Sequence, residues 1–138
     1  MEINIIGTST LSQIQEAFKA HYPYLKLAFF KTTEGASPIF NKAHLITDQT
    51  LTLQSLGKAS AHGSFSINGH LKVSTLEQHF MEQFGIPVQV FRKSGSAWLQ
   101  TNTSDNETLT EQNEKGQLAS SANNEHGETD FELYHEQV

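Results

Sequence analysis

The sequence predicts a mixed α+β fold made of two similar halves, arranged as a ferredoxin-like two-layer sandwich with an added C-terminal hairpin strand. Residues 63–101 have the pattern of a strand, a helix, a strand, a tight turn and a further strand. Residues 1–31 repeat the first three of these elements. Two strand–helix–strand units in tandem give the ferredoxin-like order when each right-handed crossover lies within one sheet. A β-grasp-like second half is the alternative arrangement.

The first half opens with a short strand at residues 2–6. Thr10 and Gln13 have the spacing of a capping box, in which each side chain accepts a hydrogen bond from the backbone N–H of the other residue. The helix that follows must end before Pro23, which restricts the preceding residue to extended angles. Residues 24–30 carry apolar side chains on both faces, so we expect a central strand that is covered on both sides.

The second half contains the more clearly bounded helix. Ser74 and Glu77 have the spacing of another capping box, which predicts a helix over residues 75–84. Gly85 can adopt the left-handed conformation that ends a helix, and Pro87 prevents its continuation. In this interpretation the helix that starts after Thr10 aligns with the helix that starts at Thr75. Side chains at intervals of four form the apolar stripe of the helix at residues 75–84: Leu76, Phe80 and Phe84.

A hairpin follows the second helix. Residues 88–92 are β-branched, aromatic and largely alternating, residues 93–96 form a turn, and residues 97–100 form the returning strand. Trp98 is the single tryptophan, and it lies on this expected edge strand. Two roles stay open for Trp98: packing against the apolar stripe of the helix, or anchoring a protein partner, where tryptophan is often a hot spot.

The chain is expected to form one α+β domain at residues 1–102, with appendages after it. Residues 32–60 form a long central loop, within which residues 50–57 predict one or two helical turns. Residues 103–116 predict a docked short helical turn, capped by Thr108 with Glu111. Residues 117–138 are too polar to bury a core and predict a disordered acidic tail.

Charge and composition narrow the classes of function. Residues 1–102 hold eight Lys/Arg and six Asp/Glu, whereas residues 103–138 hold one Lys and nine Asp/Glu. A body with so small a positive balance argues against nucleic acid as a partner. The chain has no cysteine, which excludes disulfides and thiolate metal sites. No apolar stretch approaches the length of a membrane span, so we expect no membrane partner and a cytoplasmic location.

No catalytic residue and no cofactor are predicted. Among seven histidines, His62, His70 and His79 are weak candidates for metal binding, because their spacing does not match the helical pairs that hold zinc. His44 and Asp48 could form an imidazole–carboxylate pair, although no matching nucleophile accompanies them. The glycines are dispersed, so neither a phosphate loop nor a dinucleotide fingerprint is present.

The favoured hypothesis is a non-enzymatic protein-interaction or adaptor module that uses a sheet edge, with a protein partner or with self-association. The candidate interaction residues surround the expected hairpin: Phe91, Arg92, Lys93 and Trp98. The alternative is a small-ligand or metal-binding protein, or an enzyme, that uses the 32–60 loop and nearby histidines.

Four stretches carry a resemblance to a known family: residues 22–26, 76–95, 98–99 and 108–113. At these positions the chain resembles a family of small uncharacterised bacterial proteins. The resemblance covers most of residues 1–116 and implies no activity, cofactor or catalytic residue. It departs from the family pattern at Glu107, where those proteins tend to have an aromatic residue.

Overall fold

The computed structural model describes residues 2–32, 41–56, 63–101 and 106–121. Five strands and four α-helices lie in these ranges, with one 3-10 turn. In chain order the elements are β1 Ile3–Ile6, α1 Leu11–His21, β2 Leu25–Phe29, η1 Lys42–His44, α2 Leu53–Leu56, β3 Ser64–Ile67, α3 Val73–Phe84, β4 Val88–Ser94, β5 Ala97–Gln100 and α4 Leu109–Ser121.

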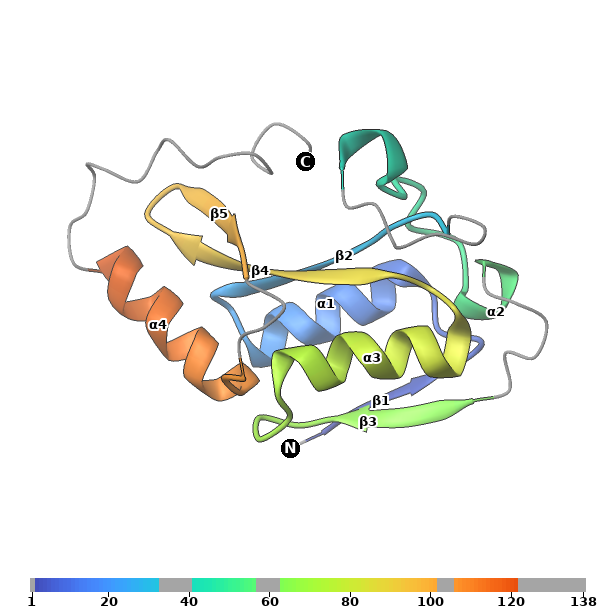
Figure 1. Ribbon diagram of the computed structural model, residues 1–138, viewed down its shortest axis with the longest axis horizontal. Coiled ribbons are helices and arrows are strands. Elements are labelled where there is room, and N and C mark those ends of the chain that lie inside the picture. Colours follow the sequence, from blue (N-terminus) through green and yellow to red (C-terminus); the bar gives the residue numbers. More distant parts are fainter. Residues whose placement is uncertain (1, 33–40, 57–62, 102–105, 122–138) are drawn as a thin grey trace.

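The strands form two antiparallel sheets, one of order β1-β3 and one of order β2-β4-β5. Helices α1 and α3 lie between the sheets and contact both of them (Figure 1). The prediction of a mixed α+β fold is therefore confirmed. The single sheet of a ferredoxin-like order is not formed, and β3 and β4 also do not share the one sheet that a β-grasp-like second half requires.

The two strands that flank the helix of each half pair with their equivalents in the other half and not with each other, whereas β5 pairs with β4 of its own half. β1 pairs with β3, and β2 pairs with β4 in the register Leu27↔Val90. Periodicity identifies which residues form strands, but it does not determine which strands pair. The prediction of a crossover within one sheet was therefore wrong. The two strands that flank each helix in the sequence lie in different sheets, one on either side of that helix.

The duplication is real, but its register differs from the sequence alignment. Leu11, Ile14 and Phe18 are the buried residues of α1, and Val73, Leu76 and Phe80 are buried with the same spacing in α3. Leu11 is therefore equivalent to Val73, whereas the sequence comparison set Leu11 against Leu76, three residues later. These side chains belong to one core that also takes residues from both sheets: Ile3, Ile5, Leu25, Leu27, Phe29, Ile67, Val88 and Val90.

The start of α3 corrects the second predicted capping box. The N-cap is Lys72, its side chain makes no capping hydrogen bond, and α3 begins at Val73. The Val73 N–H donates instead to the carbonyl of Glu107, 3.1 Å away, just before α4. A backbone contact from a distant segment thus satisfies the helix start. The predicted end is confirmed, because Gly85 is the left-handed C-cap with φ 69°.

Helix α4 is longer than the short docked turn that the sequence predicts. Its capping box is confirmed, since Thr108 Oγ1 accepts from the Glu111 N–H at 3.2 Å and Glu111 Oε1 accepts from the Thr108 N–H at 2.9 Å. The helix continues to Ser121, so residues 117–121 are helical, and residues 122–138 lie outside the described residues.

Polar contacts hold α4 against the sheet. Arg92 Nη1 donates to Gln112 Oε1 at 3.1 Å, and the Tyr24 N–H donates to Asn113 Oδ1 at 2.8 Å. Gly116 permits the close approach, because a Cβ there would lie 3.0 Å from the Tyr24 carbonyl oxygen. Hydrophobic periodicity does not detect a helix held in this way. None of the described helices is both long and apolar enough to cross a bilayer.

Candidate functional site

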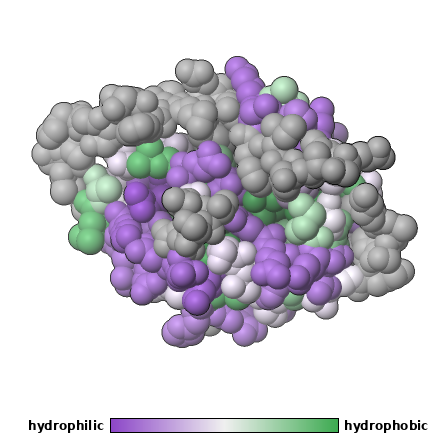
Figure 2. Space-filling view, viewed as in Figure 1, coloured by the Kyte–Doolittle hydropathy of each residue, from purple (hydrophilic) through white to green (hydrophobic). Residues whose placement is uncertain are grey.

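The described surface offers no broad apolar patch. Hydrophilic side chains cover much of the face shown in Figure 2. The large hydrophobic side chains that are exposed among the described residues come from three different elements: Ile6 of β1, Met81 of α3 and Leu118 of α4. A functional surface is therefore sought at strand edges and hollows.

The described residues cover the outer edge of β2 only in part. The Phe30 N–H donates to the Pro87 carbonyl, which lies on the β4 side. In an antiparallel ladder the backbone groups of successive residues point alternately to one side and to the other. The N–H and C=O groups of Leu27 and Phe29 therefore point away from β4. The Phe29 carbonyl accepts from the Ile46 N–H at 2.9 Å. Within the described ranges, the Leu27 carbonyl accepts a hydrogen bond only from a side chain, Gln15 Nε2, at 2.7 Å. The central loop thus covers one end of β2, and a single amide covers the middle.

A groove of ≈ 460 Å³ lies along this edge, and we call it the Trp98 groove. One wall is a flank of α1, the floor is the edge of β2, and β4 and β5 complete the far side. Its lining residues are Ser12, Gln15, Glu16, Lys19, Leu25, Lys26, Leu27, Lys93 and Trp98. The groove thus combines a strand edge, an aromatic ring and several charges.

Trp98 lies on β5 opposite Lys93, and its ring reaches across the sheet. The Nζ atoms of Lys26 and Lys93 lie 5.4 and 5.5 Å from the ring centroid, which is within the range of cation–π contacts. The ring also packs beside a small buried cluster that includes Phe30 and Phe91. This cluster is on the face of the sheet opposite the helices, so Trp98 does not pack against the stripe of α3.

The charges of the groove are mostly positive. Lys19, Lys26 and Lys93 come from α1, β2 and β4, and Glu16 is the one carboxylate among the described residues that line the groove. Burial lowers the pKa of Lys26, and the nearby positive charge of Lys19 lowers it further. Lys26 is partly buried, whereas Lys19 is exposed beside it.

The structure divides the four candidate interaction residues between two roles. Lys93 and Trp98 line the groove. Phe91 is 3% exposed and belongs to the buried cluster, and Arg92 faces α4, where it donates to Gln112. The interaction role of these four residues therefore remains a prediction. Of the four, Lys93 and Trp98 line the groove.

Gln15, Lys19 and Lys26 were missed by sequence reasoning. A signal was present for the helix, because Ser12, Gln15 and Lys19 recur at intervals of three and four and so share one flank. Nothing local indicates that this flank faces β2, because that placement depends on how the strands pair.

The histidines do not converge within the described part of the chain. His79 lies beside the ring of Phe65, with ring centroids 5.2 Å apart, His70 is exposed on a turn, and His62 lies outside the described residues. No group of three or more histidine, aspartate or glutamate side chains in these ranges could hold a metal. The proposed His44–Asp48 pair is also not observed, because His44 Nδ1 donates to Asn41 and Asp48 accepts from Thr50.

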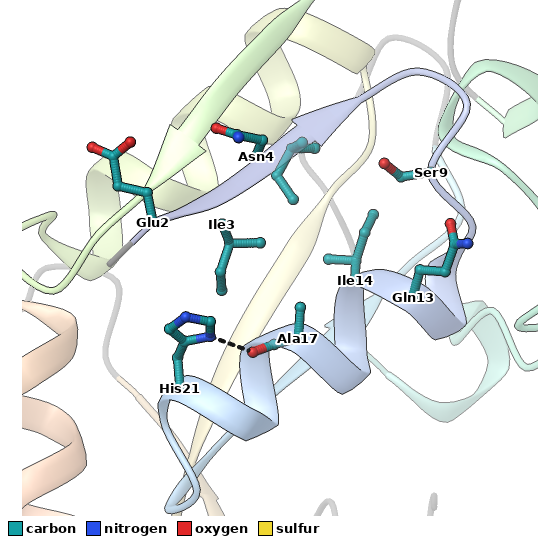
Figure 3. Close-up of a pocket in the computed structure, with 9 residues that line it drawn as sticks. Glu2, Ile3, Asn4, Ser9, Gln13, Ile14, Ala17 and His21 are labelled. Carbon is teal, nitrogen blue, oxygen red and sulfur yellow. Dashed lines mark hydrogen bonds between the residues drawn. The ribbon is translucent and has the colours of Figure 1, made fainter.

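A second hollow of ≈ 320 Å³ lies between β1 and α1 (Figure 3). Ile3 and Ile14 form part of its apolar lining. At one end His21 Nδ1 donates to the Ala17 carbonyl at 2.9 Å, while His21 Nε2 is buried without a hydrogen-bond partner in the described structure. The hollow also has polar lining residues: Glu2, Asn4, Ser9 and Gln13. Asn4, Ser9 and Gln13 accept hydrogen bonds from neighbouring backbone or side-chain groups and not from His21. The lining therefore does not show the hydrogen-bonded base and nucleophile of a catalytic set, and this hollow is a weaker candidate than the Trp98 groove.

A partly buried carboxyl group lies apart from both hollows. Glu77 on α3 accepts a hydrogen bond from the Val90 N–H of β4 at 3.3 Å. Burial raises the pKa of Glu77 to about 7, and the hydrogen bond from Val90 only partly opposes this rise. This contact ties α3 to β4 just beyond the end of β5.

Comparisons with protein-family models, with curated proteins and with solved structures found no match for this chain. A functional assignment therefore depends on the chemistry of the Trp98 groove.

Proposed function

We propose that this protein is an interaction module that binds an extended segment of a partner protein along the edge of β2, in the Trp98 groove. In this mode a peptide adds one strand to an existing sheet, and neighbouring side chains select its sequence. The function needs no catalytic group, and it uses the strand edge together with a large aromatic ring.

One observation carries the proposal: the outward backbone of β2 forms the floor of a groove whose far side contains Trp98. Unpaired strand edges readily accept another strand, so proteins usually cover them. Here the cover over Leu27 is the side chain of Gln15, a neutral group held by one hydrogen bond. Such a bond contributes about 1 kcal/mol, so an incoming strand that supplies its own N–H can replace it at little cost.

The alternative, binding of a small ligand or metal by the 32–60 loop and the histidines, has less support. The described histidines make local contacts or are exposed, as given above. A hollow beside this loop is lined by Phe30, Lys31, Thr32, Ile46, Leu56 and Ile86, and its volume is ≈ 160 Å³. That volume is below the roughly 300 Å³ at which ligand pockets begin.

Photocrosslinking tests the proposal with a control that the duplication provides. Ser12 follows the first buried residue of α1 and lines the groove, whereas Ser74 occupies the equivalent position on α3 and does not line it. A photoreactive amino acid at position 12 should crosslink a partner from native extract, and the same group at position 74 should not. Mass spectrometry of the product identifies the partner, including a second copy of this chain.

The Trp98→Ala variant gives the second arm of this experiment. Crosslinking from position 12 should be lost in this variant while its circular dichroism spectrum is retained. Equal capture from positions 12 and 74, or capture that does not depend on Trp98, would contradict binding in the groove.

A further inference from the structure

Helix α4 brings the chain to one end of the Trp98 groove. Gly116 of α4 lies against Tyr24, the residue that precedes β2. The Tyr24 carbonyl accepts from the N–H of Lys93, which lines the groove, at 2.9 Å. α4 continues beyond Gly116 only to Ser121, a distance of about 7.5 Å along the helix axis (Figure 1). The chain therefore leaves α4 close to the start of the β2 edge.

The sequence after α4 contains a stretch with the pattern of a strand. This stretch is residues 129–134, in which acidic and apolar side chains alternate: Asp130, Phe131, Glu132 and Leu133. An alternation with a period of two is typical of a strand that has one polar and one apolar face. Residues 122–128 connect it to α4, and seven extended residues span up to about 23 Å. Both segments lie outside the described residues, and the connection is long enough for residues 129–134 to reach the β2 edge.

The two faces of the β2 edge differ in the same way as the two faces of this segment. On the face away from the helices, the ring of Trp98 packs beside a small buried cluster with two phenylalanines. On the face toward α1 the lining is polar: Ser12, Gln15, Glu16 and Lys19. Because successive side chains of a strand point to opposite faces, an added strand of this sequence would place Phe131 and Leu133 toward Trp98. Its acidic side chains would face the flank of α1, where Glu16 and Lys19 are exposed to water.

We propose that residues 129–134 occupy the Trp98 groove as an added strand until a partner segment displaces them. This inference rests on the proposed function, because the two segments compete for the same edge of β2. It adds a form of regulation to that function, namely that the chain inhibits its own binding of a partner. A short linker keeps a tethered segment at an effective concentration in the millimolar range, so weak contacts are sufficient for such competition.

Quenching of tryptophan fluorescence by acrylamide tests the inference on the full chain. Trp98 is the single tryptophan of the protein, so the quenching constant reports on the exposure of the groove. Combined Phe131→Ser and Leu133→Ser substitutions should raise this constant, because they remove the apolar side chains that cover the ring. Leu118→Ser is the matched control. The Leu118 side chain is on α4, is 69% exposed and does not line the groove, so its loss should leave the constant unchanged.

Crosslinking from position 12 gives the second test. In the full chain, a photoreactive amino acid there should form a product within the chain that contains residues 129–134, and the same group at position 74 should not. The chain with Phe131→Ser and Leu133→Ser should lose this product. Its capture of a partner from native extract should rise about tenfold, the change expected when one buried apolar side chain is lost. Circular dichroism confirms the fold of each variant.

The outcomes separate this inference from the proposed function. Capture of a partner at position 12 that the two substitutions leave unchanged would overturn the inference and support the groove as a binding edge. Equal crosslinking of residues 129–134 from positions 12 and 74 would show a segment without a defined site and would also overturn it. So would an unchanged quenching constant. If position 12 crosslinks neither residues 129–134 nor a partner, both the inference and the proposed function are wrong.

Discussion

Gln15 on α1 and Glu77 on α3 occupy equivalent positions in the two halves, each four residues after the first buried residue of its helix. Both side chains reach a backbone group of the strand that follows. Gln15 donates to the carbonyl of Leu27 on β2, whereas Glu77 accepts from the N–H of Val90 on β4. Leu27 and Val90 are themselves paired in the sheet.

The difference between these two contacts separates the roles of the halves. Glu77 lies on α3 and reaches β4 just beyond the end of β5, where partial burial raises the pKa of its carboxyl group. β2 is an edge strand of that sheet, so Gln15 borders the Trp98 groove with a neutral group. The same scaffold position thus stabilises the interior in one half and covers a binding edge in the other.

The largest expected change in stability comes from substitutions that test whether α1 and α3 contribute equally to the core. Phe18→Ala and Phe80→Ala remove equivalent side chains that are 1% and 0% exposed, and each should cost about 3–5 kcal/mol of unfolding free energy. Phe80 should cost more, because its ring contacts both Phe29 and Phe65, with centroids 5.7 and 5.0 Å away. Urea denaturation measures both values. A larger loss for Phe18→Ala would contradict this ranking.

The next effect concerns the pH dependence of stability. The pKa of Glu77 is raised from 4.5 to about 7 in the folded protein. Below the unfolded pKa, Glu77 is protonated in both the folded and the unfolded state, and the protein has the full stability that this group allows. As pH rises through the folded value the buried group ionises, and stability falls by at most about 3 kcal/mol. Glu77→Gln should remove this loss, because its amide oxygen can still accept from Val90.

The variant should therefore match the wild type near the unfolded pKa and exceed its stability at mildly alkaline pH. Urea denaturation across this range gives the difference directly, and it cancels the titration of the histidines. Gln15→Met is the matched comparison in the other half, since it removes the donor to Leu27 and should cost about 1 kcal/mol at every pH. A difference in unfolding free energy between wild type and Glu77→Gln that does not change with pH would contradict the raised pKa of Glu77.

Local signals in the sequence were sufficient for much of the helical structure. The capping boxes at Thr10 and Thr108 and the glycine stop at Gly85 are all present, because each depends on residues within one turn. The strands were also placed near their observed positions. Their pairing was not, because it depends on contacts between segments far apart in the chain, and a strand carries no local mark of its partner.

Only part of the candidate site could be predicted from the sequence, because strand pairing could not. Lys93 and Trp98 are close in sequence and were recognised together, as parts of one hairpin. Lys19 and Lys26 come from the first half and join them only because β2 pairs with β4. The face on which Trp98 lies also follows from this pairing, so its position opposite the helices could not be predicted.

The smallest expected effect compares the two helix starts, where the sequence pattern is similar and the structure differs. Thr10 Oγ1 accepts from the Gln13 N–H at 3.1 Å, and Gln13 Oε1 accepts from the Thr10 N–H at 2.9 Å. Thr10→Ala should therefore cost about 1 kcal/mol. Ser74→Ala should stay within about 0.5 kcal/mol, the usual range away from such features, because Ser74 is not the N-cap of α3.

Urea denaturation of both variants, with circular dichroism to confirm the fold, measures this difference. Ser74→Ala also tests why Glu77 is free to bind Val90. A capping box would hold the Glu77 carboxyl at the helix start, whereas in the structure the Val73 N–H at that start is satisfied by the Glu107 carbonyl. A loss for Ser74→Ala as large as that for Thr10→Ala would mean that Glu77 caps the helix, and its carboxyl group would then not be tied to β4.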